Sequence, residues 1–93
     1  MKLFKTVDEK FEEIGFRKVQ DDDYGVYYER WNKDPSYTHV LAILHKSNGR
    51  HIIHSYDEDL YDTECIGNTC VGLTYYEMKL ALKKMKQKGW KSK

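Results

Sequence analysis

The sequence predicts one α+β domain in the order α-β-β-β-α, with a three-stranded antiparallel meander that carries two helices on one face. Three observations predict it. Apolar residues recur at helical spacing near both ends of the chain, aromatic and β-branched segments lie between them, and Asn48-Gly49 separates two of these segments. The 93 residues leave no room for a second core, so we expect a single domain over residues 1–93.

The first helix is predicted by an apolar stripe with spacings of three and four residues, formed by Leu3, Phe4, Val7, Phe11 and Ile14. The run from Thr6 to Glu9 has the spacing of a capping box, although the stripe starts earlier, so the helix begins there or near residue 2. Gly15 favours the left-handed conformation that ends helices, and Phe16 is placed to fold back on the last turn.

Three strands are predicted from β-branched and aromatic content, over residues 24–31, 38–46 and 51–56. Residues 32–36 contain the only proline and separate the first two strands. Asn48-Gly49 favours a two-residue type I′ turn between the second and third strands, because both central residues of that turn need positive φ.

A two-residue turn at 48–49 fixes a register in which Leu44 lies opposite Ile53 and Ile43 opposite His54. One sheet face then carries Val40, Ala42, Leu44 and Ile53. The other carries Leu41 and Ile43 among His39, His45, His54 and Tyr56. We expect both helices on the first face, because its side chains are small and aliphatic.

The second helix is predicted over residues 75–88, because Thr74 and Glu77 form a capping box and Gly89-Trp90 repeats the earlier helix stop. Its expected buried stripe is Tyr75, Met78, Ala81, Leu82 and Met85. Residues 57–72 follow no period and are expected to form an irregular loop of functional or mobile character.

Composition restricts the classes of function and location. Apolar residues make up 40% of the chain, charged residues 33%, and the net charge is +1, so a folded domain is expected and no long-range field favours nucleic acid. The N-terminal residues lack an apolar signal-peptide core, and no run approaches the ~20 apolar residues of a membrane helix. With only two cysteines, we expect a reducing cytoplasmic location and no membrane contact.

Four histidines between residues 39 and 54 raise the question of a metal site. His45 and His54 would be diagonal neighbours on one sheet face, but a closed site needs two further ligands, so a solvated sheet face is the favoured interpretation. Cys65 and Cys70 are four residues apart, which matches neither a redox pair nor half of a zinc knuckle. We therefore expect no cofactor, no metal and no enzymatic activity; the alternative is a small hydrolase or metal enzyme built on His39, His45 and His54.

Nucleic-acid binding is the second candidate function. Lys79, Lys83 and Lys86 lie on one flank of the second helix, and the order of elements resembles that of double-stranded RNA-binding domains. The acidic runs 21–23 and 57–59 would repel the same ligand. A solvated helix face whose lysines complement the helix dipole is the alternative.

Protein binding is the leading function because Tyr and Trp, which anchor protein interfaces, are abundant here. The candidates are Tyr24, Tyr27, Tyr28, Trp31 and Tyr56. Cover by the loop 57–72 would bury the same rings without a partner. A homodimer through the exposed sheet face is a further possibility.

Several motifs together resemble a group of small proteins carried by phages and prophages of low-GC Gram-positive bacteria. These motifs are the run from Phe11 to Val19, the aromatic Tyr27-Tyr28-Glu29, the run from Leu73 to Met78, and the later Lys83-Lys84-Met85 and Gly89-Trp90. The resemblance implies an accessory role in a phage-infected cell, through modulation of a host protein. It carries over no functional residue, because each motif is a helix start or stop.

Overall fold

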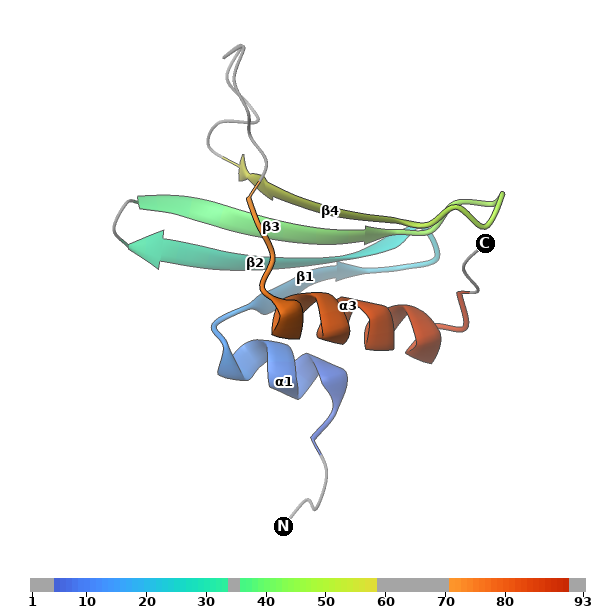
Figure 1. Cartoon of the computed structure of the whole chain (residues 1–93), viewed down its shortest axis with the longest axis horizontal. Helices are drawn as coiled ribbons and strands as arrows, with labels where there is room; N and C mark the ends of the chain where they lie inside the picture. The colour runs from blue at the N-terminus through green and yellow to red at the C-terminus, as the bar shows by residue number, and fades with distance from the viewer. Residues whose placement is uncertain (1–4, 34–35, 59–70, 91–93) are drawn as a thin grey trace.

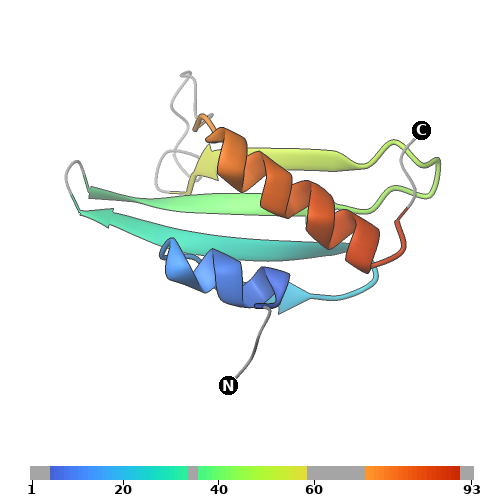
Figure 2. The same cartoon turned by 60° about the horizontal axis from the view of Figure 1, so that its bottom comes forward.

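The computed structural model describes residues 5–33, 36–58 and 71–90, which form two layers (Figure 1). One layer is a sheet and the other is a pair of helices lying on one side of it, as Figure 2 shows from a second direction. The elements are α1 Val7–Glu13, β1 Arg17–Asp21, β2 Gly25–Lys33, β3 Ser36–Leu44, β4 Ile52–Asp57 and α3 Tyr75–Gln87. The predicted α+β class, antiparallel meander and one-sided helices are confirmed.

The sheet has four strands in the order β1-β2-β3-β4, one more than predicted. The additional strand β1 has the sequence RKVQD, and all five of its residues are exposed. Charged edge residues give no alternation of buried and exposed positions, so the segment lacks the usual strand pattern. Its pairing with β2, interrupted by a shift between Lys18 and Gln20, is what makes it a strand.

Both helix starts and both helix stops follow the prediction. Thr6 and Glu9 exchange reciprocal hydrogen bonds of 3.1 and 3.2 Å, and Thr74 and Glu77 exchange bonds of 3.1 and 2.8 Å. Gly15 and Gly89 have φ of 95° and 79°, which side chains with a Cβ rarely adopt. These local signals therefore fix where α1 and α3 begin and end.

The turn between β3 and β4 differs from the predicted hairpin. Leu44 pairs with Ile52, so the connection spans residues 45–51, and the Gly49 amide donates to the Lys46 carbonyl at 3.0 Å. Only Gly49 has positive φ there, which excludes the type I′ turn. The register therefore shifts by one residue, which moves every β4 side chain to the opposite face and places Ile53 across from Ile43.

The helices cover the sheet face opposite to the predicted one. Their side chains form one core with those of β2 and β3: Phe11, Phe16, Val26, Tyr28, Leu41, Ile43, Leu80, Ala81 and Met85. Phe11 of α1 stacks on Tyr28 at 4.1 Å between ring centroids. This face offers larger apolar side chains than the Val40 and Ala42 face, and its one histidine, His39, is accommodated because both ring nitrogens find partners.

The buried stripe of α3 is also rotated from the predicted one. Residues facing the core are Glu77, Leu80, Ala81, Lys84 and Met85. Tyr75 and Leu82, which were expected inside, are 80% and 53% exposed, and Met78 is 36% exposed. The rotation places the charged Glu77 and Lys84 inside, where Glu77 forms an ion pair with Arg30 and Lys84 forms one with Asp8.

No helix among the described residues is long and apolar enough to cross a membrane.

Candidate functional site

The sheet face turned away from the helices is the first candidate surface, and we call it the outer face. Because side chains alternate along a strand, it comprises Tyr27, Glu29, Trp31, Val40, Ala42, Leu44, Ile52, His54 and Tyr56. Both helices lie on the other side of the sheet (Figure 2). Among the described residues, no helix or strand is stacked on the outer face.

Aromatic and aliphatic side chains dominate the outer face. Trp31 is 63% exposed and Ile52 45% exposed, while Tyr27 and Tyr56 are half-buried. The rings of His54 and Tyr56 lie 4.6 Å apart between centroids. Strands β2, β3 and β4 hold these side chains on a continuous hydrogen-bonded framework, which suits recognition of a protein surface.

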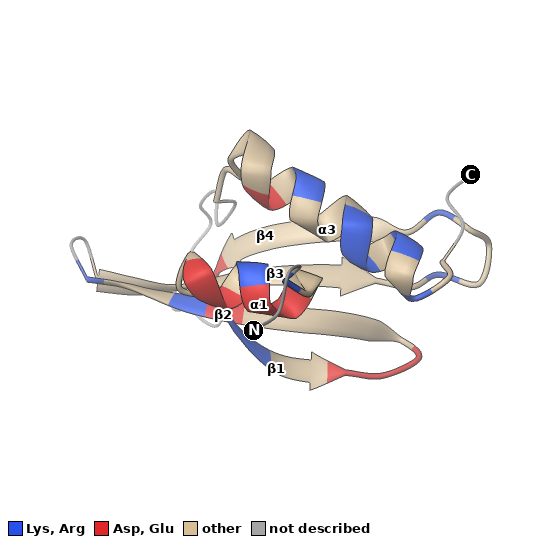
Figure 3. Cartoon of the chain, turned by 90° about the horizontal axis from the view of Figure 1, so that it is seen from below, with Lys and Arg blue, Asp and Glu red and all other residues tan. Residues whose placement is uncertain are grey.

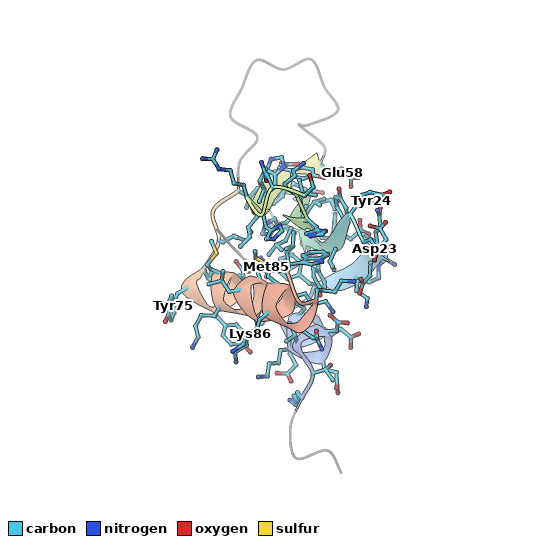
Figure 4. All side chains as sticks on the ribbon, turned by 90° about the vertical axis from the view of Figure 1, so that its right-hand side faces the viewer. Asp23, Tyr24, Glu58, Tyr75, Met85 and Lys86 are labelled. Atoms are coloured by element: carbon cyan, nitrogen blue, oxygen red, sulfur yellow. The ribbon has the colours of Figure 1, made fainter. Side chains whose placement is uncertain are left out.

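The structure separates the five aromatic residues that the sequence nominated. Tyr27, Trp31 and Tyr56 all lie on the outer face, at different positions along β2 and β4. Tyr24 is 81% exposed but lies in the β1–β2 turn, at the edge of the molecule (Figure 4). Tyr28 is fully buried under α1, so it is unavailable to a partner. Strand alternation puts Tyr28 on the same side as Val26, but only the position of α1 shows that this is the covered side.

Beneath the helices, a polar network connects Arg30, His39, Ser55 and Glu77. The Arg30 guanidinium lies 3.2 Å from His39 Nδ1, and His39 Nε2 lies 2.6 Å from Ser55 Oγ. Glu77 of α3 is 3% exposed and pairs with Arg30 at 2.8 Å. Arg30 also donates to the Ile14 carbonyl and lies over the Phe16 ring at 4.2 Å, so it joins α1 to α3.

A serine and a histidine in contact suggest a catalytic pair, but the proton positions argue against one. Guanidinium nitrogens only donate, so His39 Nδ1 must accept from Arg30 and the ring proton must lie on Nε2. Nε2 therefore donates to Ser55 and has no lone pair to remove the Ser55 proton. This network orients side chains and does not activate a nucleophile.

His39 is expected to remain neutral with its proton on Nε2 at pH values where an ordinary histidine is half charged. Burial lowers its pKa below 6.5 and the Arg30 charge lowers it further, against weaker effects of Glu77 and Asp57. The measurement is a nitrogen-15 NMR titration of the imidazole resonances. A His39 that carries its proton on Nδ1, or that titrates above pH 6.5, would contradict the assignment.

A second network holds the opposite end of the helix pair. The Tyr28 hydroxyl donates to Asp8 Oδ1 at 2.6 Å, and the ammonium groups of Lys18 and Lys84 lie 2.9 and 3.1 Å from the Asp8 oxygens. Lys84 is only 5% exposed. Partial burial would raise the pKa of Asp8, but the hydrogen bonds from Tyr28, Lys18 and Lys84 outweigh it and lower the pKa to about 2.

The acidic run 21–23 has a structural role in this region. Asp21 pairs with Lys18 at 3.0 Å and Lys88 at 2.6 Å, which joins β1 to the end of α3. Asp22 Oδ1 accepts from the amides of Tyr24 and Gly25 and closes the β1–β2 turn. Two of the partners are local, since Lys18 precedes Asp21 and Thr74 precedes Glu77 by three residues. The partners Lys84 of Asp8, Lys88 of Asp21 and Arg30 of Glu77 are distant in the chain and could not be inferred from the sequence.

The histidines that the sequence grouped lie in three different places. His39 is under the helices, His54 is on the outer face, and His45 stacks on Trp90 at 4.8 Å with His51 beside it. No group of three or more potential metal ligands forms within the described part of the chain. Cys65, Cys70 and most of the predicted 57–72 loop lie outside the described residues.

The three lysines of the nucleic-acid prediction do share the outward side of α3. Figure 3 shows lysine positions along α3, with α1 beside it. The charge of Lys10, on α1, lowers the pKa of Lys83. In Figure 4 Lys86 and Tyr75 point away from the sheet, whereas Met85 faces it.

The chain was compared with protein-family models, with curated proteins and with solved structures, and none of the three comparisons gave a match.

Proposed function

We propose that this chain is a non-enzymatic domain that binds another protein through the outer face of its sheet. The observation that carries the proposal is the exposure of Trp31 and Ile52 at the two ends of a face that carries Tyr27 and Tyr56 between them and that neither helix covers. Exposed aromatic residues on a rigid framework are typical anchors of protein interfaces, because they bury large apolar areas at low entropic cost.

The distribution of polar groups supports binding over catalysis. The buried titratable side chains of the described residues serve the two networks under the helices, where each has a structural partner. The outer face offers Glu29, which pairs with Arg17 at the β1 edge, and His54, which lies against Tyr56. Such a face suits contact with an apolar protein surface that has a polar rim.

The resemblance to phage and prophage proteins indicates the class of partner. An accessory protein of an infected cell acts on host proteins, so a host protein is the partner that we propose. A domain held rigid by ion pairs between α1, α3 and the sheet would present its outer face with little loss of conformational freedom.

Affinity capture from a host lysate, with matched variants, tests this proposal. Trp31→Ser is expected to reduce recovery of the captured protein at least tenfold, because an aromatic anchor buried in an interface is worth about 2 kcal/mol or more. Ile52→Ser is expected to reduce recovery less strongly, because it removes a smaller apolar side chain. Tyr75→Ser is the control, since Tyr75 is even more exposed but lies on α3. Equal capture by wild type and by folded Trp31→Ser and Ile52→Ser proteins would contradict the proposal.

A further inference from the structure

The outward side of α3 carries apolar side chains that have no place in the core. Tyr75, Met78 and Leu82 were expected to be buried, yet they are 80%, 36% and 53% exposed. Their spacing of three and four residues places them on one side of the helix. The core does not need them, because Leu80, Ala81 and Met85 fill the inner side.

Lysines accompany this apolar row. Lys79, Lys83 and Lys86 lie beside it, and among the described carboxylates none pairs with any of them. The Lys79 ammonium group lies over the Tyr75 ring at 5.3 Å. The charge of Lys10, and less strongly that of Lys79, lowers the pKa of Lys83.

These features restrict the kind of partner that can bind the outward side of α3. A second copy docked through the same surface would bring lysines against lysines. A phosphate backbone would use the lysines but would place Leu82 and Met78 against charged groups. A broad anionic surface such as a bilayer would also cover α1, on which Figure 3 shows acidic positions in red. Glu12 is exposed there and would be repelled, while Glu13 is exposed but pairs with Lys5.

We propose that the outward side of α3 binds an acidic amphipathic helix of another protein. Its apolar residues would cover Tyr75, Met78 and Leu82, and its carboxylates would meet Lys79, Lys83 and Lys86. A single helix is about 10 Å wide, so it fits along α3 without covering α1. All six side chains then have a partner of matching chemistry, which the other occupants do not provide.

This surface and the outer face lie on opposite sides of the two-layer molecule (Figure 2). A partner on α3 would therefore leave the outer face accessible. If the proposed function is correct as well, the domain holds two proteins at once and acts as an adaptor. The α3 proposal does not depend on the outer face, because the two surfaces share no residue.

The test uses a labelled 14-residue synthetic helix with Leu at heptad positions a and d and Glu at e and g, and its counterpart with Lys in place of Glu. We expect saturable binding of the acidic peptide by fluorescence anisotropy and none of the basic one. Leu82→Asp and the pair Lys79→Glu with Lys86→Glu should each weaken binding at least tenfold. Leu82→Gln should weaken peptide binding less than Leu82→Asp does. It keeps the test valid if Leu82→Asp fails to fold.

Controls separate the possible explanations. Lys33→Glu and Lys46→Glu change the same charge away from α3 and should leave peptide binding within twofold of wild type, as should Trp31→Ser. Absence of saturable binding would overturn the proposal. Conversion of a dimer into a monomer by Leu82→Asp, measured by light scattering, would also overturn it. So would binding of a 20-base-pair RNA duplex through the same lysines that Leu82→Asp leaves unchanged.

Discussion

Glu77→Ala is expected to lower the free energy of unfolding by about 2–4 kcal/mol, because it leaves the partly buried Arg30 charge under α3 without its carboxylate. Glu77 is 3% exposed, and its other oxygen accepts from the Thr74 amide at 2.8 Å. The change therefore also removes half of the capping box. Urea denaturation followed by circular dichroism is the measurement.

Two further variants identify the cause of that loss. Glu12→Ala removes an exposed carboxylate from α1 and should change stability by no more than about 0.5 kcal/mol. Arg30→Met combined with Glu77→Ala should cost less than the sum of the single changes, because no unpaired charge remains. Strict additivity of the two changes would show that the Arg30–Glu77 pair does not hold α3 on the sheet.

Asp8→Ala is expected to lower the free energy of unfolding by about 2–4 kcal/mol, because it leaves the buried Lys84 and the Tyr28 hydroxyl without their acceptor. Asp21 lies 3.7 Å from the Lys84 ammonium group and compensates in part. Asp23→Ala is the matched control, since Asp23 is exposed and lies in the β1–β2 turn. An equal loss in both variants would contradict the role assigned to Asp8.

The Asp8 contribution also predicts a pH dependence. Its pKa is about 2 in the folded chain and 3.8 ordinarily, so folding favours the charged form. The resulting stabilisation is complete above about pH 5 and is lost as the pH falls through 3.8 towards 2. Allowing for solvent screening, wild type should lose about 1–2 kcal/mol more in this window than Asp8→Ala, in which Asp21 and Asp22 still have lowered pKa values. Urea midpoints at pH 5 and pH 2.5 measure it.

The parts of the fold that follow from local chemistry could be predicted from the sequence. Capping boxes at Thr6 and Thr74 and left-handed glycines at residues 15 and 89 act within one turn, so their residues alone specify them. The register of β3 with β4 could not be predicted in this way. Asn48-Gly49 suits a tight hairpin, but the seven-residue connection lets Ile53 reach the core beside Ile43.

The buried stripe of α3 was predicted wrongly for a similar reason, because contacts between distant parts of the chain decide which side of the helix is buried. Charged residues count against burial in a pattern of apolar spacing, so Glu77 and Lys84 directed the expected stripe of α3 towards Tyr75 and Leu82. Their partners Arg30 and Asp8 lie more than forty residues away in the chain, and only the folded structure shows that the charges are paired. The same error hid the exposed apolar row of α3.

The residue types of the candidate site could be predicted from the sequence, but the particular residues that lie on it could not. Abundant Tyr and Trp predicted a protein-binding surface, which stays a prediction, and the structure places Tyr27, Trp31 and Tyr56 on one face of the sheet. Tyr28 could not be separated from Tyr27 until strand alternation was tied to the position of α1. The missed edge strand β1 adds the Arg17–Glu29 pair at the border of this face.

Hydroxyl-radical footprinting of the chain, alone and in complex with its captured partner, tests the central claim most directly. We expect oxidation of Trp31, Tyr27 and Tyr56 to fall on binding, while Tyr24 in the β1–β2 turn reacts as in the free chain. Unchanged oxidation of Trp31 and Tyr56 in a complex that protects other side chains would show that the partner does not dock on the outer face.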